Sequence, residues 1–291
     1  MSILVTGSTG RIGSQVVSKL VASGSQVRAM TRSPEKATFP AGVEVIKGDL
    51  LDTTSVREAL AGVSTLFLLV PNSPDEITQA MNTVGLAQDA GVRGIVYLSV
   101  TRSDVFADVP HFASKHAVER MMAQRGIGAT VLRPSYFIQN DLGQKEPMLG
   151  GGLYVSPIGD KGVSMVDTDD IAEAAARELL RREKSATPLP TEVYEVVGPD
   201  ALTGDAVARI WAEALGREVK YAGDDLDAME NAMKRFAPGW LAYDMRLMMH
   251  RYQRDGAAAS TADVDRFTQL LGRAPRSYRD FAQAAAKGWS A

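Results

Sequence analysis

The sequence predicts an α/β fold in which helices cover both faces of a doubly wound parallel sheet. Two observations carry this prediction. A glycine-rich turn follows the first apolar run, and over two thirds of the chain apolar runs alternate with helical patterns. Such alternation is typical of parallel strands joined by crossover helices. A small, mostly helical C-terminal subdomain is expected to follow.

The first element contains the most informative motif. The apolar run from Ile3 to Val5 reads as a buried strand, glycines follow at positions 7, 10 and 13, and a helical pattern begins after Gly13. Strand, glycine turn and helix together are typical of a dinucleotide-binding site. Gly7 would allow the tight turn, Gly10 the approach of a pyrophosphate, and Gly13 close packing of helix on strand. An ordinary glycine turn is the alternative.

Seven strands are expected in all. Their ranges are 3–5, 27–30, 43–46, 65–70, 95–99, 130–133 and 191–197. Apolar residues at helical spacing predict helices from residue 16, at 55–60, 77–90 and 113–124, from Asp169 onward, and at 277–287 with Ser277 as N-cap. The first, fourth and fifth strands are nearly continuous apolar runs, as expected when both faces of a sheet are covered.

Cofactor choice in such folds is read where the second strand ends. An acidic residue there binds the ribose 2′-hydroxyl of NAD, whereas an arginine accommodates the 2′-phosphate of NADP. The sequence places Arg32 at this point and has no carboxylate before Glu35. It therefore favours NADP(H), and a solvated arginine at a strand end is the alternative.

Residues beside the turn and after the third strand extend the expected cofactor site. Thr9, Arg11 and Ile12 lie within the glycine turn, where they would add contacts to the phosphates. Asp49 and Leu50 follow the third strand, where the carboxylate would bond the adenine amino group. Capping the next helix is an equally good role for Asp49.

Four parts of the chain are expected to have different roles. Residues 1–142 would form the NADP-binding domain, and 143–165, rich in glycine, an insert that covers the cofactor cleft as a loop or hairpin. Residues 166–198 would return a helix and a strand to the sheet. Residues 199–291 would form the C-terminal subdomain, with only helices and loops from Ala201 onward.

Composition limits the function classes. The 291 residues include no cysteine, which excludes disulfides and cysteine nucleophiles, and the histidines lack zinc-motif spacing, so no metal is expected. A net charge of -3 without a Lys/Arg cluster argues against nucleic acid, and the apolar runs are too short to span a membrane. A strand beginning at residue 2 or 3 leaves no room for a signal peptide, so a cytoplasmic protein is expected. Surface helices are compatible with a homodimer.

Several motifs together resemble a known family. The glycine turn, Arg32, Gly48-Asp-Leu50, Tyr97-Leu-Ser99 and Leu132-Arg-Pro-Ser135 are similar to an atypical short-chain dehydrogenase/reductase of the NmrA-like branch. That branch includes triphenylmethane reductase and the second NADPH:quinone oxidoreductase of bacteria. The resemblance covers nearly the whole chain, with less specific motifs after about residue 170. It implies a Rossmann domain, a small C-terminal domain and a substrate cleft between them.

The resemblance also implies catalytic residues. Classical members of the superfamily use a serine and a Tyr-x-x-x-Lys motif; Ser99 and Lys115 match, but His111 stands where the tyrosine would be. Lys115 would bond the nicotinamide ribose, and Ser99 would bond the substrate or the nicotinamide. Without the tyrosine, alcohol–ketone interconversion lacks its acid. His111 could supply the proton, and a packing role at the helix start is the alternative.

Further residues would border the bound cofactor. Val70 and Pro71 would flank the adenosine and ribose, and Ser135 and Tyr136 would border the nicotinamide. Tyr136 would contact substrate or pack in the core. The methionine-rich segment from Trp240 to His250 would likewise line an aromatic pocket or pack in the core.

The expected function is an NADPH-dependent reductase that transfers hydride to a small aromatic or conjugated acceptor. Quinones, dye cations and activated double bonds suit an enzyme without a strong acid. Two alternatives stay open. The first is a non-catalytic NADP(H)-binding protein that senses redox state, and the second is carbonyl reduction or epimerisation with His111 as the acid.

Overall fold

The computed structural model describes residues 2–290, with only the backbone for Ser290. These residues form two compact units. Unit 1 comprises residues 2–103, 111–133 and 168–194, and unit 2 comprises residues 104–110, 134–167 and 195–290. Within this range no helix combines the length and apolar character needed to cross a bilayer.

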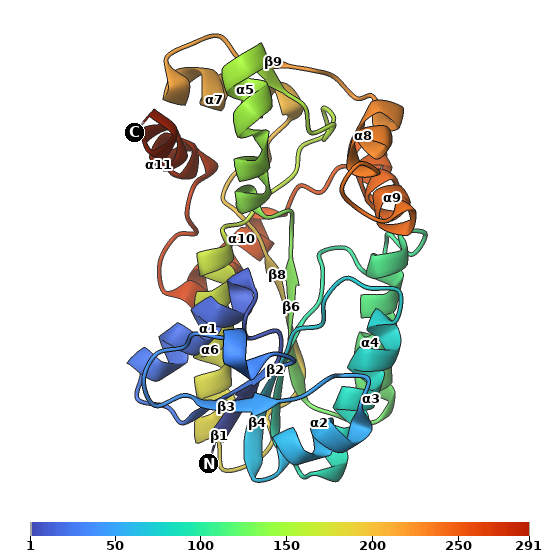
Figure 1. Cartoon of the computed structure of the whole chain (residues 1–291), viewed down its shortest axis with the longest axis vertical. Coiled ribbons are helices and arrows are strands. Elements are labelled where there is room, and N and C mark those ends of the chain that lie inside the picture. The colour runs from blue at the N-terminus through green and yellow to red at the C-terminus, as the bar shows by residue number, and fades with distance from the viewer. Residues whose placement is uncertain (1, 291) are drawn as a thin grey trace. The chain divides into compact units, whose positions relative to one another are not determined.

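A seven-stranded sheet in the order β3-β2-β1-β4-β5-β6-β8 forms the centre of unit 1 (Figure 1). The registered pairs among β1 to β6 are all parallel. The strands are β1 (Ser2–Val5), β2 (Val27–Thr31), β3 (Glu44–Lys47), β4 (Val63–Leu68), β5 (Gly94–Leu98), β6 (Ala129–Pro134) and β8 (Glu192–Val196). Strand order reverses beside β1, and open α/β sheets bind ligands at such a point. The predicted doubly wound α/β fold is confirmed.

Helices cover both faces of this sheet. On one face α1 (Arg11–Ala22) lies along α6 (Thr168–Lys184), joined by the Lys19–Asp169 ion pair at 2.8 Å. On the other face α2 (Thr53–Leu60), α3 (Glu76–Asp89) and α4 (Pro110–Gln124) bury their apolar residues in one core with β4 and β5 (Figure 1). A short 3-10 turn, η1 (Pro34–Lys36), follows β2.

Unit 2 is mostly helical. Its elements are η2 (Ile138–Gln144), α5 (Lys145–Gly151), β7 (Leu153–Tyr154), α7 (Gly204–Leu215), β9 (Lys220–Tyr221), α8 (Leu226–Met233), α9 (Gly239–Asp255), α10 (Thr261–Leu271) and α11 (Tyr278–Ser290). An aromatic cluster joins α7 to α11, in which the Trp211 ring meets Tyr278 and Phe281 edge-on. Helices α8 and α9 pack against each other.

Two sequence-based expectations for unit 2 are wrong. Residues 143–165 do not form a single loop or hairpin: they contain α5 and β7, and β7 pairs in parallel with the distant β9, whereas residues 155–165 lie outside any helix or strand, as expected of a loop. The glycines that suggested a loop end α5 instead, since Gly152 is its left-handed C-cap at φ 63°. The strand β9 also contradicts the expectation of only helices and loops after Ala201. Its two residues are too few to show the alternation that identifies a strand in a sequence.

Element boundaries move some candidate residues. Helix α4 begins at Pro110, three residues before the predicted start, because proline is well tolerated in a first helical turn. His111 therefore lies in that first turn. Strand β4 ends at Leu68, so Val70 and Pro71 both follow the strand. Ser277 accepts a hydrogen bond from the Asp280 amide at 3.0 Å, as expected of an N-cap.

Candidate functional site

The glycine turn of unit 1 is closed by backbone contacts that leave no room for side chains. Gly7 adopts φ +60°, in the region that favours glycine. A Cβ on Gly13 would lie 2.1 Å from the Gly7 carbonyl oxygen, so helix α1 approaches the turn after β1 more closely than any residue with a side chain would allow. The first amides of α1 follow Gly10, which provides no side-chain cap, and no acid occupies the first turn. Such a helix start suits a phosphate.

Two side chains fix this turn to neighbouring strands. The Thr6 hydroxyl donates to the Leu69 carbonyl at 2.8 Å and accepts from the Leu69 amide at 2.9 Å. The Ser8 hydroxyl donates to the Met30 carbonyl at 2.8 Å. The turn is therefore held at the ends of β4 and β2 before any ligand binds.

A pocket of about 600 Å³ opens beside the turn. It brings together seven predicted cofactor residues: Gly7, Thr9, Gly10, Arg32, Asp49, Leu50 and Pro71. The other predicted residues of unit 1, Arg11, Ile12, Gly13, Val70 and Lys115, do not line it, although Gly13 shapes the turn. The lining also includes polar residues that the sequence did not single out: Thr31, Ser33, Ser73, Asp75 and Gln79.

The two roles considered for Asp49 are partly separated by the structure. Helix α2 is capped by Asp52, whose carboxylate accepts from the Thr54 amide at 3.0 Å, so the capping role for Asp49 is wrong. Asp49 instead accepts from the Leu51 amide at 3.0 Å, which fixes its carboxylate at the pocket wall.

Lys115 lies in a nearly buried ion pair. Its Nζ is 2.5 Å from Oε1 of Glu76, and the two side chains are 13% and 4% exposed. An ammonium group has three donors, so this pair leaves others for a ligand. The ribose contact stays a prediction, and Glu76 is the partner that sequence reasoning missed.

Ser99 belongs to a buried polar network centred on Glu119. Its hydroxyl donates to Glu119, and the same carboxylate accepts from Ser103 at 3.1 Å. Arg133 binds Glu119 through both Nε, at 3.1 Å, and Nη2, at 2.6 Å. The Ser99 hydroxyl therefore donates its proton to Glu119, so it can only accept a hydrogen bond from a ligand.

His111 packs at the start of α4. Its ring lies edge-on to Phe112 with centroids 4.6 Å apart, and its carbonyl accepts from the Ser114 hydroxyl at 3.1 Å. These contacts fit the packing role considered for it. A catalytic role stays a prediction.

A second pocket, of about 690 Å³, lies within unit 2. Methionines from α8 and α9 form much of its wall: Met229, Met233, Met245, Met248 and Met249. Its polar lining residues are Tyr136, Asn140, Gln144, Ser156 and Asp225, and none of the lysines or arginines among the described residues lines it. Part of the methionine-rich segment thus lines a pocket, while Met248 and Met249 also contribute to the core.

Tyr136 connects this pocket to a buried carboxylate. Its hydroxyl donates to Asp141 Oδ1 at 3.2 Å, and the Tyr154 hydroxyl donates to Oδ2 at 3.1 Å. Tyr278 also donates to Oδ2 and accepts from Trp211 Nε1 at 2.8 Å. Burial raises the pKa of Asp141 to about 6, although the three hydroxyls oppose the shift.

Ser135 precedes Tyr136 and is 3% exposed. Its amide donates to the Val196 carbonyl at 3.0 Å, and among the described residues its hydroxyl has no hydrogen-bond partner. A buried unpartnered hydroxyl is unusual in a native protein. The nicotinamide contact expected of Ser135 would provide one and stays a prediction.

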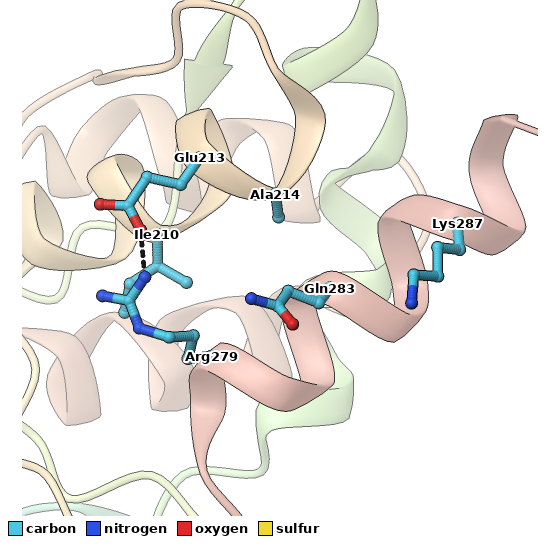
Figure 2. Close-up of a pocket in the computed structure, with 6 residues that line it drawn as sticks. All are labelled: Ile210, Glu213, Ala214, Arg279, Gln283 and Lys287. Carbon is cyan, nitrogen blue, oxygen red and sulfur yellow. Dashed lines mark hydrogen bonds and ion pairs between the residues drawn. The ribbon is translucent and has the colours of Figure 1, made fainter.

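A third pocket, of about 210 Å³, lies between α7 and α11 (Figure 2). Arg279 and Glu213 face each other across it and form an ion pair (Figure 2). This pair neutralises Arg279, so Lys287 remains as a single cation among the lining residues. One exposed lysine is too little to define an anion site.

The fold and the glycine-turn pocket define a Rossmann-type protein. Residues 1–259 match the NmrA-like family, and the chain belongs to that family.

Individual relatives are similar along almost the whole chain. A (4-alkanoyl-5-oxo-2,5-dihydrofuran-3-yl)methyl phosphate reductase of Streptomyces griseus is 32% identical, with 99% of each chain covered. An NAD(P)H azoreductase of Xenophilus azovorans is 30% identical, also with 99% of each covered.

Solved structures of the family have the same fold. The NADPH-dependent quinone oxidoreductase QOR2 of Escherichia coli, complexed with NADPH, is 26% identical with a TM-score of 0.85, and covers 98% of this chain and 99% of its own. The triphenylmethane reductase of Citrobacter sp., complexed with NADP(H), is 26% identical with a TM-score of 0.84, and covers 97% and 99%. The resemblance found in the sequence is confirmed.

The contact between Gly13 and Gly7 predicts the effect of one methyl group. Gly13→Ala should destabilise the protein by about 1–3 kcal/mol, because the new Cβ would overlap the Gly7 carbonyl and force backbone movement. Thermal unfolding without ligand measures this cost.

Gly10→Ala is the matched control. Its Cβ would lie 3.3 Å from the same carbonyl oxygen, a tight contact that a small backbone shift relieves, at a φ of -79° that alanine adopts, so its melting temperature should fall much less than that of Gly13→Ala. Equal melting temperatures for Gly13→Ala and wild type would show that the turn is not closed by this contact.

Proposed function

We propose that this protein is an NADPH-dependent reductase that transfers hydride to an uncharged or cationic aromatic or conjugated acceptor. The observation that carries the proposal is the 690 Å³ pocket of unit 2, which is walled by methionine and lined by no cationic residue. Methionine adapts to flat or irregular apolar ligands. The relatives named above include an azoreductase, a quinone oxidoreductase and a dye reductase, and such acceptors share a conjugated system.

The residues of unit 1 fit a dinucleotide phosphate cofactor. The uncapped start of α1 offers amides for the pyrophosphate, and a side chain at Gly10 would crowd it. Arg32 lines the same pocket and offers a planar fork of donors for a 2′-phosphate. Asp49 and Pro71 would border the adenosine. When bound, the cofactor supplies the hydride.

The lining of the second pocket indicates which acceptors it admits. Burying an anion without a cationic partner costs free energy. The apolar pocket offers no lysine or arginine among its lining residues, so it disfavours a phosphate or a sulfonate. Asp225, which caps α8 through the Ala228 amide at 2.8 Å, is the charged lining residue. The pocket therefore favours neutral or cationic acceptors, in contrast to the phosphate ester named for the Streptomyces relative.

The chain's own groups would position the reactants and exclude water. In a dry site, correct placement of two reactants accounts for much of a rate enhancement. Tyr136 is the titratable hydroxyl of the pocket wall, and we propose that it contacts the acceptor. In unit 1, Lys115 would bind the nicotinamide ribose, with Ser99 as an acceptor of hydrogen bonds. In unit 2, Ser135 has a buried hydroxyl without a partner among the described residues, which would suit the nicotinamide.

Arg32 should determine the preference between the two nicotinamide cofactors. Arg32→Ala should weaken NADPH binding by about 10- to 100-fold, because a charge-assisted hydrogen bond contributes about 1.5–3 kcal/mol. The affinity for NADH should change less than about twofold, because NADH lacks the 2′-phosphate that Arg32 would bind. Fluorescence titration of each cofactor measures both values.

Arg57→Ala is the control for this change. Arg57 is an exposed arginine of α2, with a side chain 61% exposed, and it does not line the pocket. Its removal should affect neither cofactor. Equal weakening of NADPH and NADH in Arg32→Ala would contradict the 2′-phosphate role.

An acceptor panel tests the reductase function. NADPH oxidation should be fastest with neutral quinones, neutral azo compounds and triarylmethane cations. Sulfonated azo dyes of matched size should show at least about a tenfold lower kcat/KM, equivalent to 1.4 kcal/mol of lost binding. Intact NADPH binding without turnover of any acceptor would contradict the proposed reductase function and favour a non-catalytic redox sensor.

A further inference from the structure

The tyrosine–carboxylate cluster of unit 2 has a feature that packing alone does not require. Asp141 is fully buried, and its two oxygens accept hydrogen bonds from three tyrosines: Tyr136, Tyr154 and Tyr278. Of these four side chains, Tyr136 alone lines the 690 Å³ pocket. A hydrogen-bonded path thus runs from a buried acid to the pocket wall through one hydroxyl.

The proton on Asp141 decides the direction of the hydrogen bond to Tyr136. An ionised carboxylate only accepts, so the Tyr136 proton points to Asp141 and away from the pocket. A protonated carboxyl can donate to the Tyr136 oxygen, which frees the phenolic proton for a ligand in the pocket. A single proton on the buried acid therefore controls whether Tyr136 offers a hydrogen-bond donor to the pocket.

We propose that Asp141 is the proton reservoir of the acceptor site and that its carboxyl proton reaches the acceptor through the Tyr136 hydroxyl. The inference rests on the reductase function proposed above. Asp141 is a positioning residue in this scheme, because it acts on the acceptor through Tyr136.

The reduction of an azo group shows how the step balances. One nitrogen of the N=N bond receives the hydride from the reduced nicotinamide, and the π-electron pair moves to the other nitrogen. That nitrogen takes the phenolic proton of Tyr136 while the Tyr136 oxygen takes the carboxyl proton of Asp141. The acceptor becomes a hydrazine, the nicotinamide is oxidised, and Asp141 is left ionised until solvent returns a proton through Tyr136.

The surroundings of Asp141 keep it ready for this role near neutral pH. Burial raises its pKa to about 6, and the three tyrosine hydroxyls limit the rise. The groups that face the cluster from neighbouring elements are uncharged at that pH: Ser156 after β7, Trp211 of α7 and Tyr252 of α9. No charged side chain of the described residues is among the causes of the shift.

The proton requirement of the acceptor provides the test. A neutral azo compound needs one proton when it takes up hydride, whereas a triarylmethane cation becomes a neutral product and needs none. Asp141→Asn should lower kcat for the azo compound by about 100-fold, the lower end of a general-acid effect. Its kcat for the dye cation should stay within about twofold of wild type. Tyr136→Phe also changes the pocket wall, so its test is the ratio of the two kcat values: the azo-to-dye ratio should fall by a similar factor as in Asp141→Asn. This variant serves if Asp141→Asn fails to fold.

The pH profile adds a readout that a structural role would not move. Wild-type azo reduction should decrease as the pH rises through about 6, because Asp141 loses its proton there. Tyr154→Phe keeps the path to Tyr136 but removes a hydrogen bond that lowers this pKa, so the decrease should move to higher pH. Infrared difference spectra of the protein without cofactor should show a carboxylic-acid band that titrates near pH 6 and is absent from Asp141→Asn.

The possible results separate the two proposals. If Asp141→Asn and Tyr136→Phe both reduce the azo compound and the dye cation as well as wild type does, the relay alone is overturned. Equal loss with both acceptors, or a wild type that reduces only the dye cation, would also overturn it. Failure of the wild type with every acceptor would overturn the reductase function and the relay together.

Discussion

The close approach of α1 to the glycine turn after β1 is the constraint on which the cofactor site depends. The Gly7 carbonyl lies where a Gly13 side chain would be, and this contact fixes the start of α1 relative to the end of β1. Thr6 and Ser8 then tie the turn to the ends of β4 and β2. The open amides of α1 consequently face a pocket whose wall already contains Arg32 and Asp49.

On the proposed function, each of the two pockets would supply a different kind of chemistry. The pocket of unit 1 is lined by backbone, small polar side chains and an arginine, which suits phosphates and ribose. The pocket of unit 2 is lined by methionines, other apolar side chains, a few uncharged polar groups and Asp225, which suits a neutral or cationic conjugated ring system. Substrate choice within the family would then be set by the lining of unit 2, while the glycine turn is common to proteins with unrelated substrates.

Local sequence patterns predicted the parts of this protein that are themselves local. The glycine turn, Arg32 and the individual strands could be predicted because each has a local signature: a glycine spacing, a residue at a strand end, or an apolar run. Segment 143–165 was misread because the glycines that end α5 are the same residues that occur in loops, and its strand pairs with Lys220 and Tyr221. Pairing at such a distance leaves no signal in a single sequence.

The Asp141 cluster was missed for the same physical reason. Its members come from η2, β7 and α11, and Tyr278 lies 137 positions beyond Asp141. Tyr136 could be predicted as a site residue because it follows a predicted strand. Its hydrogen-bond partner Asp141 could not, because Asp141 lies in a segment without a motif. Glu119 is the partner of Ser99, and Glu76 is the partner of Lys115. Both were missed because the sequences of α4 and α3 do not reveal which of their charged residues lie on the buried face.

Direct hydride transfer from a nicotinamide to a conjugated acceptor is tested most directly by isotope transfer. NADPH carrying deuterium on one face of the nicotinamide C4 would be incubated with the protein and a triarylmethane cation, and the product analysed by mass spectrometry. The account predicts deuterium on the central carbon of the product for one of the two labelled faces and none for the other. Cofactor oxidation with no label in the product from either face would contradict it.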